Sequence, residues 1–533
     1  MSQIINQNDE EIYFEKNAIL SKSVLWELQK KAYCQFGPAA WQAKNVPFYL
    51  TSNPLIARHY AQIVVGFFRD CLALRQSFSI DLKQPFYILD LGAGTGRFAY
   101  LFLNELFEML ANLKMPFRIC YVMTDIVEAN IEFWKKHDYF QAFLKEGFLD
   151  FAYYDHTDRK NGLDLVYSGV KLTADVLRNP LLVIANYFFD TIPHDIFCVK
   201  GHVLYEGRIS LSYKKTKESK ILSTTDPSII PHIIHHVEYF PVESIEAFDI
   251  EDPEYSKILK SYAQEYENIP YFLFPVGAFQ VIRYLRGLSN DRLLFLTGDQ
   301  GITSDKQLLE DIPFFAKHDS FSMSVNYHAI EAYFKQSKGF CLLTSSSDHK
   351  MVHMAAVSCL GKNEVPELRE AFRLTLDTFE PQDYFKIVET AFNGWKDSNL
   401  EFMIKLIKLG VWDPINFNLF FSRIREKLAS ASEKEREELI TAIHQCWKKF
   451  FPVHKDEGAF VVNLGVLLYD MKQYDEAIQY FQYALKLGYE EPLVFKNIFL
   501  AYQAKKDPET ARIWYEKGLA LHFKNINQSD SYE

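Results

Sequence analysis

Short apolar runs and longer segments with helical spacing alternate along the first two thirds of the chain. Four runs have the length of buried strands, at residues 86–90, 118–124, 148–154 and 181–185. Dense apolar positions over 98–110 predict a core-facing helix between the first two runs, and 56–68 shows helical spacing ahead of them. Strands that alternate with helices predict an α/β fold with a doubly wound, mostly parallel sheet.

The pattern changes in two places before residue 360. From about 196 to 248, β-branched and charged residues break the alternation, and we interpret this region as an insertion that contains a hairpin. The alternation then resumes with a predicted helix, strand and helix at 278–288, 292–296 and 327–335. The apolar runs 340–344 and 351–357 flank the polar stretch 345–348 and predict an antiparallel hairpin. The sheet is therefore expected to carry one reversed strand.

Beyond a boundary at 361–366 the sequence loses its strand-like runs and becomes helical. The charged stretch 430–438 favours a solvated helix face over a link. Small and aromatic residues then recur after 34 positions, which is the period of tetratricopeptide repeats. The first register is Leu464, Gly465, Tyr474, Ala477, Phe481 and Ala484, and adding 34 to the first and to the last three gives Ile498, Ala511, Tyr515 and Gly518. A pair of ordinary amphipathic helical hairpins is the alternative.

The patterns together predict four parts of the chain. They are an α/β domain at 1–362, a helical connecting region at 363–454, tetratricopeptide-type repeats at 455–525 and a disordered tail at 526–533. Because two repeats are too few to be stable alone, helices within 381–451 are expected to supply neighbours. Such repeats form concave surfaces that bind peptides or proteins, so we expect a protein or peptide partner there.

Composition narrows the classes of function. Of the 533 residues, 48% are hydrophobic and 24% are charged, as in a soluble globular protein. The net charge of −11 argues against a nucleic-acid partner, because contact with the phosphate backbone needs a basic face. The seven cysteines include no C-x-x-C pair, which suits a reducing compartment and gives no spacing for a metal site. We find no signal-peptide core and no run of ~18 apolar residues, so we expect a cytoplasmic protein without a membrane span, with non-classical export as an open alternative.

A glycine-rich turn follows the first predicted strand and leads into a helix. Its residues are Asp90, Gly92, Gly94 and Gly96, in the spacing G-x-G-x-G. Dinucleotide loops usually have G-x-G-x-x-G and phosphate-binding Walker loops end in Gly-Lys-Ser/Thr, so neither pattern is present. A glycine turn preceded by an acid suits a cofactor with an adenosine and an amino-acid tail but no phosphates. Asp90 can then organise the site around the cationic amino group.

Two further acids follow predicted strands. Asp125 ends the second strand, where a carboxylate can accept both hydroxyls of a ribose. It lies 29 residues beyond Gly96, which requires a long intervening helix, and a helix N-cap is the alternative role. Asp155 follows the third strand and could face an adenine amino group, or it could be a plain turn residue.

The glycine motif, the segment 186–193 (Asn-Tyr-Phe-Phe-Asp-Thr-Ile-Pro) and the early segment 48–52 (Phe-Tyr-Leu-Thr-Ser) together resemble the MidA-type methyltransferases. That family includes the mitochondrial arginine methyltransferase that assists complex I assembly. The resemblance extends over roughly 46–357 and implies a Rossmann-like class I methyltransferase sheet that binds S-adenosyl-L-methionine. Two departures stand out: Tyr187 replaces a Glu, and the segment 296–301 (Leu-Thr-Gly-Asp-Gln-Gly) replaces a more usual Asp-Tyr-Gly. The loss of that acid argues against an arginine substrate, because a guanidinium favours carboxylate partners.

The expected reaction is methyl transfer from S-adenosylmethionine to a nitrogen on a protein. Asn186 leaves the fourth strand at the crevice, where its carbonyl could orient an N–H group, and Asp190 could accept a proton or pair with a cationic substrate. A loop-capping role is the alternative for Asp190, and a satisfied, buried side chain is the favoured interpretation of His328. A catalytically inactive cofactor-binding scaffold, whose repeats recruit a partner, is the alternative function. A nucleotide-sugar or NAD enzyme is disfavoured by the glycine spacing.

Overall fold

The computed structural model describes most of the chain. The described ranges are 10–37, 49–158, 161–215, 223–250, 252–310, 315–317, 320–336, 339–344, 351–358, 360–394 and 399–529. The chain divides into two compact units, one made of Met1–Ser52 with Ile56–Glu380 and the other of Asn53–Leu55 with Pro381–Glu533. Each unit is described by itself below.

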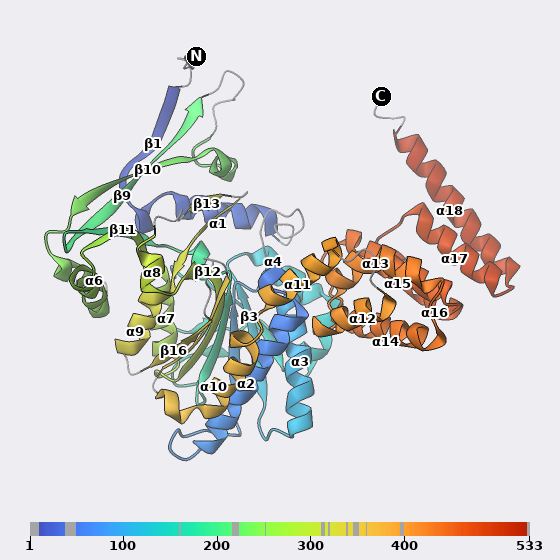
Figure 1. Cartoon of the computed structure of the whole chain (residues 1–533), viewed down its shortest axis with the longest axis horizontal. Coiled ribbons are helices and arrows are strands. Elements are labelled where there is room, and N and C mark those ends of the chain that lie inside the picture. The colour runs from blue at the N-terminus through green and yellow to red at the C-terminus, as the bar shows by residue number, and fades with distance from the viewer. Residues whose placement is uncertain are drawn as a thin grey trace. The chain divides into compact units, whose positions relative to one another are not determined.

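A central sheet forms the core of the first unit (Figure 1). Its strand order is β16-β17-β12-β7-β2-β3-β4, and the short β15 (Val325–Asn326) also pairs with β12. The strands are β2 (Phe86–Leu91), β3 (Ile119–Asp125), β4 (Leu149–Tyr153), β7 (Leu181–Asn186), β12 (Leu293–Ile302), β16 (Phe340–Leu343) and β17 (Met351–Val357). β4, β3, β2, β7 and β12 run parallel to one another, whereas β17 is antiparallel to both β12 and β16.

The predicted α/β fold with one reversed strand is therefore confirmed. β2 and β7 are neighbours, which brings the first and fourth predicted strands together as expected. The order β4-β3-β2-β7-β12 agrees with the Rossmann-like sheet expected from the sequence. The polar stretch 345–348, predicted as the turn of the last hairpin, lies outside the described residues.

Helices cover both faces of this sheet because their apolar stripes pack against the buried strands. They are α2 (Pro54–Ala73), α3 (Arg97–Leu113), α4 (Glu128–Lys136), α5 (Gln141–Lys145), α7 (Val276–Leu288), α9 (Tyr327–Gln336) and α10 (Pro366–Phe372). α3 is 17 residues long, which provides the separation expected between the glycine loop and Asp125. The short elements are β5 (Leu163–Asp164), β6 (Lys171–Leu172) and α8 (Asp305–Leu308).

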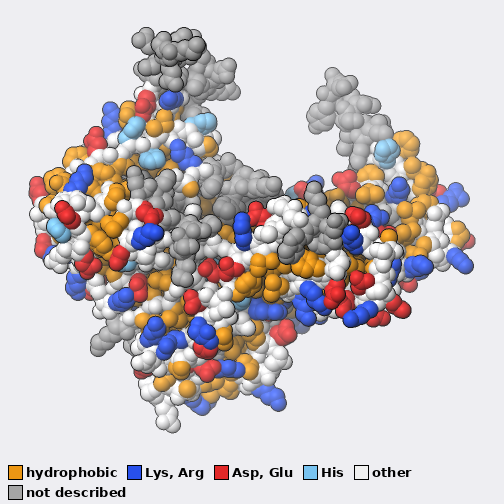
Figure 2. All heavy atoms as spheres, in the orientation of Figure 1, with side chains coloured by type: hydrophobic (Ala, Val, Ile, Leu, Met, Phe, Trp, Pro, Cys, Tyr) orange, Lys and Arg blue, Asp and Glu red, His pale blue; other side chains and the backbone are white. Residues whose placement is uncertain are grey.

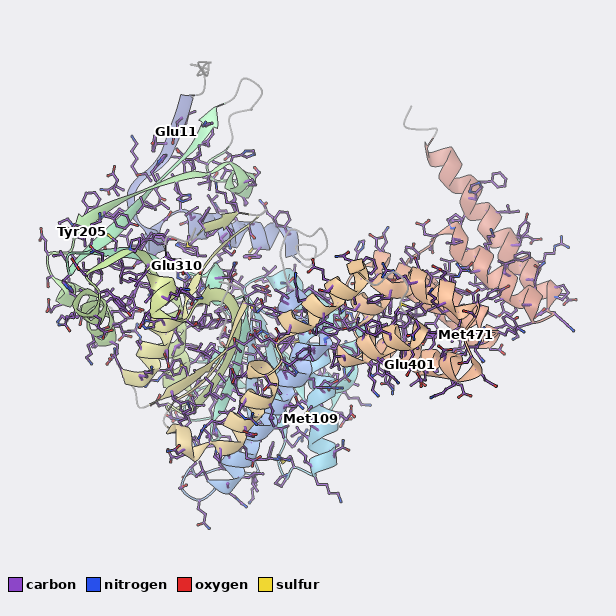
Figure 3. All side chains as sticks on the ribbon, in the orientation of Figure 1. Glu11, Met109, Tyr205, Glu310, Glu401 and Met471 are labelled. Atoms are coloured by element: carbon purple, nitrogen blue, oxygen red, sulfur yellow. The ribbon has the colours of Figure 1, made fainter. Side chains whose placement is uncertain are left out.

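A second, antiparallel sheet adjoins the first in the same unit. The hairpin predicted within 196–248 is present as β8 (Asp195–Lys200) and β9 (Val203–Lys215). It is part of a larger sheet, in which β1 (Glu10–Ile19), β10 (Ile234–Pro241) and β11 (Asn268–Phe274) also pair. Glu11 and Tyr205, labelled in Figure 3, mark this sheet on β1 and β9. The segment is therefore not a self-contained insertion, because it pairs with strands from both sides of the sequence.

α1 (Leu25–Phe36) comes after β1 in the chain. It is hydrogen-bonded to a small hairpin of β13 (Phe315–Lys317) and β14 (Phe321–Met323). The side chain of Gln29 donates a hydrogen bond to the carbonyl of Phe321 at 2.5 Å and accepts one from its N–H at 3.0 Å. Leu25, Leu28 and Ala32 bury the apolar side of α1 in the core of the antiparallel sheet. α6 (Pro253–Glu265) completes this part of the unit.

The second unit is helical throughout its described residues. Its helices are α11 (Pro381–Gly394), α12 (Leu400–Leu409), α13 (Pro414–Leu428), α14 (Glu433–Lys449), α15 (Gly458–Asp470), α16 (Tyr474–Lys486), α17 (Pro492–Ala504) and α18 (Pro508–Ser529). α14 confirms that most of the stretch 430–438 is helical, and Ser432 caps it by accepting a hydrogen bond from the N–H of Glu435. α18 extends to Ser529, so the described residues 526–529 are helical and not a disordered tail.

Small residues at the repeat positions allow the paired helices to approach closely. A Cβ on Gly465 of α15 would lie 2.6 Å from the ring of Phe481 on α16, and one on Gly518 of α18 would lie 3.0 Å from Cβ of Phe495 on α17. Rings of α14 continue the packing, with Trp447 and Tyr480 centred 5.0 Å apart. The helices before the repeats therefore supply the expected neighbours.

Charged side chains of both signs are interspersed over the helices of the second unit on the face shown in Figure 2. Figure 3 labels Met471 at the turn that joins α15 to α16. Over the described ranges, no helix combines the length and the apolar character that crossing a membrane requires.

Candidate functional site

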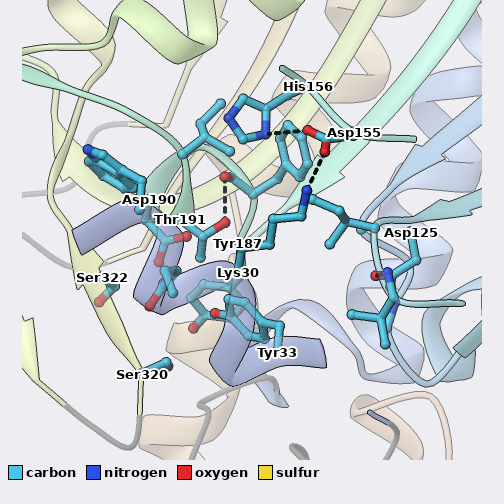
Figure 4. Close-up of a pocket in the computed structure, with 18 of the residues that line it drawn as sticks. Lys30, Tyr33, Asp125, Asp155, His156, Tyr187, Asp190, Thr191, Ser320 and Ser322 are labelled. Carbon is cyan, nitrogen blue, oxygen red and sulfur yellow. Dashed lines mark hydrogen bonds and ion pairs between the residues drawn. The ribbon is translucent and has the colours of Figure 1, made fainter. Parts of the chain in front are cut away.

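A cavity of about 510 Å³ opens at the carboxyl ends of β2, β3, β4 and β7 (Figure 4). This is the position at which open α/β sheets bind ligands. Seven of the eight predicted site residues line it: Asp90, Gly92, Gly94, Asp125, Asp155, Asn186 and Asp190. The strand order thus brings together residues that are as far apart as Asp90 and Asp190 in the sequence.

The glycine loop adopts backbone conformations that other residues rarely take. Gly92 has φ of +68° and Gly94 has φ of +56°. A Cβ on Gly92 would lie 3.3 Å from the ring of Phe188. Gly94 is held from both sides, because its N–H donates to Oδ2 of Asp125 at 3.1 Å and its carbonyl accepts from Nε1 of Trp134 at 2.9 Å. The loop therefore presents backbone, without side chains at Gly92 and Gly94, to the cavity.

Gly96, the eighth predicted residue, does not line the cavity. It is the N-cap of α3 and has φ of +81°. A Cβ there would lie 2.7 Å from Cε of Met123 and 2.9 Å from Cζ of Phe140. Its place in the structure is behind the loop, where it lets α3 pack closely against the sheet.

Asp90 is almost fully buried beside the loop, with 3% of its surface exposed. Its Oδ2 accepts a hydrogen bond from the hydroxyl of Tyr121 at 2.8 Å, and its carbonyl accepts one from Thr124 at 2.9 Å. Burial raises the pKa of Asp90 to about 7, against the opposing effect of the hydrogen bond from Tyr121. A cationic ligand group would favour its ionised form.

Asp125 ends β3 and binds the loop while lining the cavity. Its Oδ1 accepts from the N–H of Val127 at 3.0 Å, and its Oδ2 accepts from Gly94 and from Nδ2 of Asn130 at 2.9 Å. Burial raises its pKa to about 6, although these hydrogen bonds oppose the rise. Asp125 therefore stabilises the turn that leads into α4. A ligand hydroxyl would donate to a carboxylate that these hydrogen bonds already hold in place.

Asp155 lines the cavity but has a partner within the protein. Nζ of Lys30 on α1 lies 2.7 Å from its Oδ2 (Figure 4). Thr157 donates to its Oδ1 from the N–H at 2.9 Å and from the hydroxyl at 2.6 Å. Burial acts to raise the pKa of Asp155, but the hydrogen bonds from Lys30 and Thr157 outweigh it and lower the pKa to about 2. Contact with an adenine amino group therefore requires Lys30 to share or leave this carboxylate. The neighbouring His156, which the sequence did not indicate, also lines the cavity.

Asn186 is the last residue of β7, and only one of the two polar atoms of its side chain has a hydrogen-bond partner among the described residues. Its Oδ1 accepts a hydrogen bond from the hydroxyl of Tyr60 at 2.9 Å, so the carbonyl expected to orient a substrate is already occupied. Its Nδ2 is buried and meets no acceptor among the described residues. Tyr187, which follows, has φ of +49°, a strained conformation for a bulky residue and one that concentrates at functional sites.

Asp190 lies at the same end of the cavity, in the short helical turn Phe189–Thr191. It is 4% exposed, and burial raises its pKa to about 7. Beside it lies Asp299, a fully buried carboxyl of β12. The segment 296–301, which lacks the Asp-Tyr-Gly pattern, thus still supplies a carboxyl next to Asp190, although Asp299 itself does not line the cavity.

The remaining wall of the cavity comes from α1 and from residues next to β14. Trp26 and Tyr33 of α1 and Ser320 line it, together with the predicted side chains. No local sequence pattern indicated these residues, because the contact between α1 and β14 joins segments almost 300 positions apart. His328 lies elsewhere, bound to the hydroxyl of Tyr262 at 2.7 Å and to Asp305 at 3.2 Å, in agreement with a satisfied side chain.

The charge of the lining residues limits the ligands that fit. The acidic ones are Glu27, Asp90, Asp125, Asp155 and Asp190, whereas the lysines are Lys22 and Lys30. An excess of carboxylates disfavours a pyrophosphate and favours a ligand that carries positive charge. The bare glycine backbone, the buried Asp90 and the unsatisfied amide of Asn186 fit an adenosine cofactor with a cationic amino-acid tail.

Comparisons with known proteins identify one segment by sequence. Residues 460–489 match the family model for the tetratricopeptide repeat, which is consistent with the packing of α15 and α16. A search of curated proteins found no match.

Among solved structures, an uncharacterised protein from Burkholderia thailandensis is 11% identical at a TM-score of 0.37, over 65% of this chain and 87% of its own. A second member of its superfamily from the same organism, solved with S-adenosyl-homocysteine, is 12% identical at a TM-score of 0.35, over 57% and 77%. Phosphoethanolamine N-methyltransferase 1 of Haemonchus contortus, solved with phosphoethanolamine and S-adenosylhomocysteine, is 10% identical at a TM-score of 0.23, over 72% and 60%. Because these TM-scores are low, the fold is assigned from the strand order and register of the sheet and not from these structures.

Proposed function

We propose that this chain is an S-adenosylmethionine-dependent methyltransferase that methylates a nitrogen on a protein substrate. The observation that carries the proposal is one cavity with two different ends. The glycine loop with Asp90 and Asp125 lines one part of it, and Asn186 with Asp190, at and after the end of β7, lines another; Asp125 and Asp190 lie on opposite sides in Figure 4. The structures solved with S-adenosylhomocysteine and the resemblance to MidA-type methyltransferases agree with this proposal but are not its basis.

The residues of the glycine-loop end would bind and orient the cofactor. Gly92 and Gly94 offer backbone at close range, Asp90 attracts the cationic amino group, and Asp125 accepts hydrogen bonds from the ribose hydroxyls. When bound, S-adenosylmethionine supplies an electrophilic methyl group. Phe188 and Tyr187 line the cavity between the two ends and exclude water from the reacting atoms.

The residues of the other end would receive the methyl acceptor. Nδ2 of Asn186 can donate a hydrogen bond that fixes the acceptor, and Asp190 can take up the proton that a nitrogen loses when it is methylated. Alignment of the nitrogen with the methyl carbon is the main demand of such a displacement. The repeats support a protein as the acceptor, because stacked helical hairpins form surfaces that bind peptides and proteins.

Two measurements test the proposal. Calorimetry should show S-adenosylhomocysteine binding to the purified chain and none to Gly94→Val. Radiolabelled methyl transfer into fractionated cell extract should label a protein band, and Asp190→Asn should abolish the label while retaining cofactor binding. If the wild-type chain binds the cofactor but labels no fraction, the inactive scaffold that recruits a partner replaces the enzyme.

A further inference from the structure

The register of two neighbouring strands places a second carboxyl behind Asp190. β12 runs parallel to β7, and Gly298 is paired with Asn186. Asp299 therefore lies next to the turn that carries Asp190. Its Oδ2 accepts from the N–H of Phe189 at 3.2 Å and from the hydroxyl of Thr297 at 3.4 Å.

The side chains of Asp190 and Asp299 are in hydrogen-bond contact with each other. Oδ1 of each is buried and meets no N–H or O–H group of the described residues. Two carboxylates cannot donate to one another, so this contact is favourable only when one of the two carries a proton. Asp190 lines the cavity, whereas Asp299 does not and is fully buried.

The groups around the pair leave its charge unbalanced. Four tyrosines face the pair. They are Tyr33 on α1, Tyr60 on α2, Tyr187 in the turn after β7 and Tyr327 on α9. Burial raises the pKa of each above the ordinary value, so all four are neutral at physiological pH. Burial also lowers the pKa of His194 to about 4 and that of His353 to about 3. In the described part of the chain, no lysine or arginine forms an ion pair with either carboxyl.

We propose that Asp190 and Asp299 share one proton, and that Asp299 is a positioning residue that holds the Asp190 carboxylate ready to accept a proton from the methyl acceptor. This rests on the proposed function. The nitrogen forms the new N–C bond with its lone pair, and the bond between the methyl carbon and sulfur breaks with its electron pair remaining on sulfur. The N–H proton then passes to Asp190, and it leaves to solvent when the product is released.

The pair gives methyl transfer a defined dependence on pH. Burial raises the pKa of Asp190 to about 7 and that of Asp299 well above the ordinary value, and the two titrate as a unit. Below pH 7 both carboxyls are protonated and cannot accept a proton, whereas above pH 7 one negative charge is available. Activity should therefore rise with pH through about 7.

Asp299→Asn separates this role from a purely structural one. An Asn retains an oxygen that can accept from Phe189, and its amide donates to Asp190 without titrating. The hydrogen bond from the protonated Asp299 lowers the pKa of Asp190 against the effect of burial, and an amide is the weaker donor. In the variant the pKa of Asp190 therefore rises, and the acidic limb of the pH–rate profile should move up by on the order of one pH unit. Loss of structure alone would lower the rate at all pH values without moving the limb.

The proton itself can be measured without an acceptor. Infrared spectra of the full-length wild-type chain at about pH 9 should show the carbonyl stretch of a protonated carboxylic acid, since ordinary Asp and Glu side chains are ionised there. Asp299→Asn should lose this band, and Asp305→Asn, a change at an exposed carboxyl, should keep it. Absence of the band in the wild type overturns the proposal even if the variant does not fold, as does a band that persists in folded Asp299→Asn. If the band is present but the chain transfers no methyl group, the proposed function is overturned. The sharing of a proton by Asp190 and Asp299 is then still supported.

Discussion

At the glycine-loop end of the cavity, donors of the same chain bind both buried carboxyls, whereas at the acceptor end three buried polar atoms lack a partner among the described residues. Tyr121 donates to Asp90, and Gly94, Val127 and Asn130 donate to Asp125. At the other end, Oδ1 of Asp190, Oδ1 of Asp299 and Nδ2 of Asn186 are buried without partners among the described residues. Unsatisfied buried groups cost ~1–3 kcal/mol each, so such a cluster is retained for a reason other than stability. Under the proposed function, one end is preformed for the cofactor, and the methyl acceptor would supply the missing partners at the other end.

Gly94→Val should have the largest effect, because it places a branched side chain on the loop at φ of +56°. We expect S-adenosylhomocysteine binding to disappear in calorimetry, while the circular dichroism spectrum remains that of the wild type. Gly169→Ala is the matched control, since Gly169 also has positive φ but has no neighbouring atom within 4 Å of an added Cβ. Equal loss of binding in both variants would assign the effect to backbone strain and not to the cavity.

Asn186→Ala and Asp190→Ala should affect only the acceptor end. We expect both variants to keep their affinity for S-adenosylhomocysteine and to lose about 10²-fold or more in the rate of methyl transfer, as for a positioned acid–base group. Exposed Asp164 provides the control variant Asp164→Ala. Wild-type rates in both variants would place the chemistry at other residues of the cavity.

The sequence predicted the glycine-loop end better than the acceptor end for a physical reason. Asp90, Gly92 and Gly94 follow one another on a single strand and turn, so their arrangement is local. Asp299 faces Asp190 only because β12 pairs with β7 in one particular register, and no local pattern encodes that pairing. The antiparallel sheet was missed for the same reason, since β1 pairs with a strand almost 200 residues later.

Asp125→Ala should weaken S-adenosylhomocysteine binding by about 1–3 kcal/mol, the cost of leaving ligand hydroxyls unpaired. Isothermal calorimetry measures this loss, and thermal unfolding shows how much of it follows from the freed N–H of Gly94. Glu128→Ala, a change at an exposed residue of α4, is the control. An unchanged affinity would contradict contact between Asp125 and the ribose.

Cofactor affinity should also depend on pH through Asp90. Its pKa is raised to about 7 in the free protein, and a bound ammonium group favours the carboxylate. Binding must therefore lower that pKa, so that affinity rises with pH up to about 7 and falls on the order of tenfold per pH unit below it. Calorimetry in two buffers at pH 6.5 should detect a released proton, and Asp90→Asn should release none.

The smallest effect is expected from a change in the second unit. Gly465→Leu forces a side chain against the ring of Phe481 and should lower the thermal stability of the repeats. Affinity for S-adenosylhomocysteine should stay within about a factor of two, because the cavity lies within the first unit. A larger change in affinity would show that the repeats influence the cofactor site.

The pair of hydrogen bonds between Gln29 and Phe321 has a consequence for the synthesis of the chain. The two residues are 292 positions apart, and at ~5–20 residues per second the ribosome needs roughly 15–60 s to cover that interval. For the first part of this time the apolar side of α1, with Leu25, Leu28 and Ala32, lacks the core residues from 196 onwards that bury it. The nascent chain therefore exposes a hydrophobic helix long before its binding surface exists, and this segment is the natural one for a chaperone to cover during synthesis.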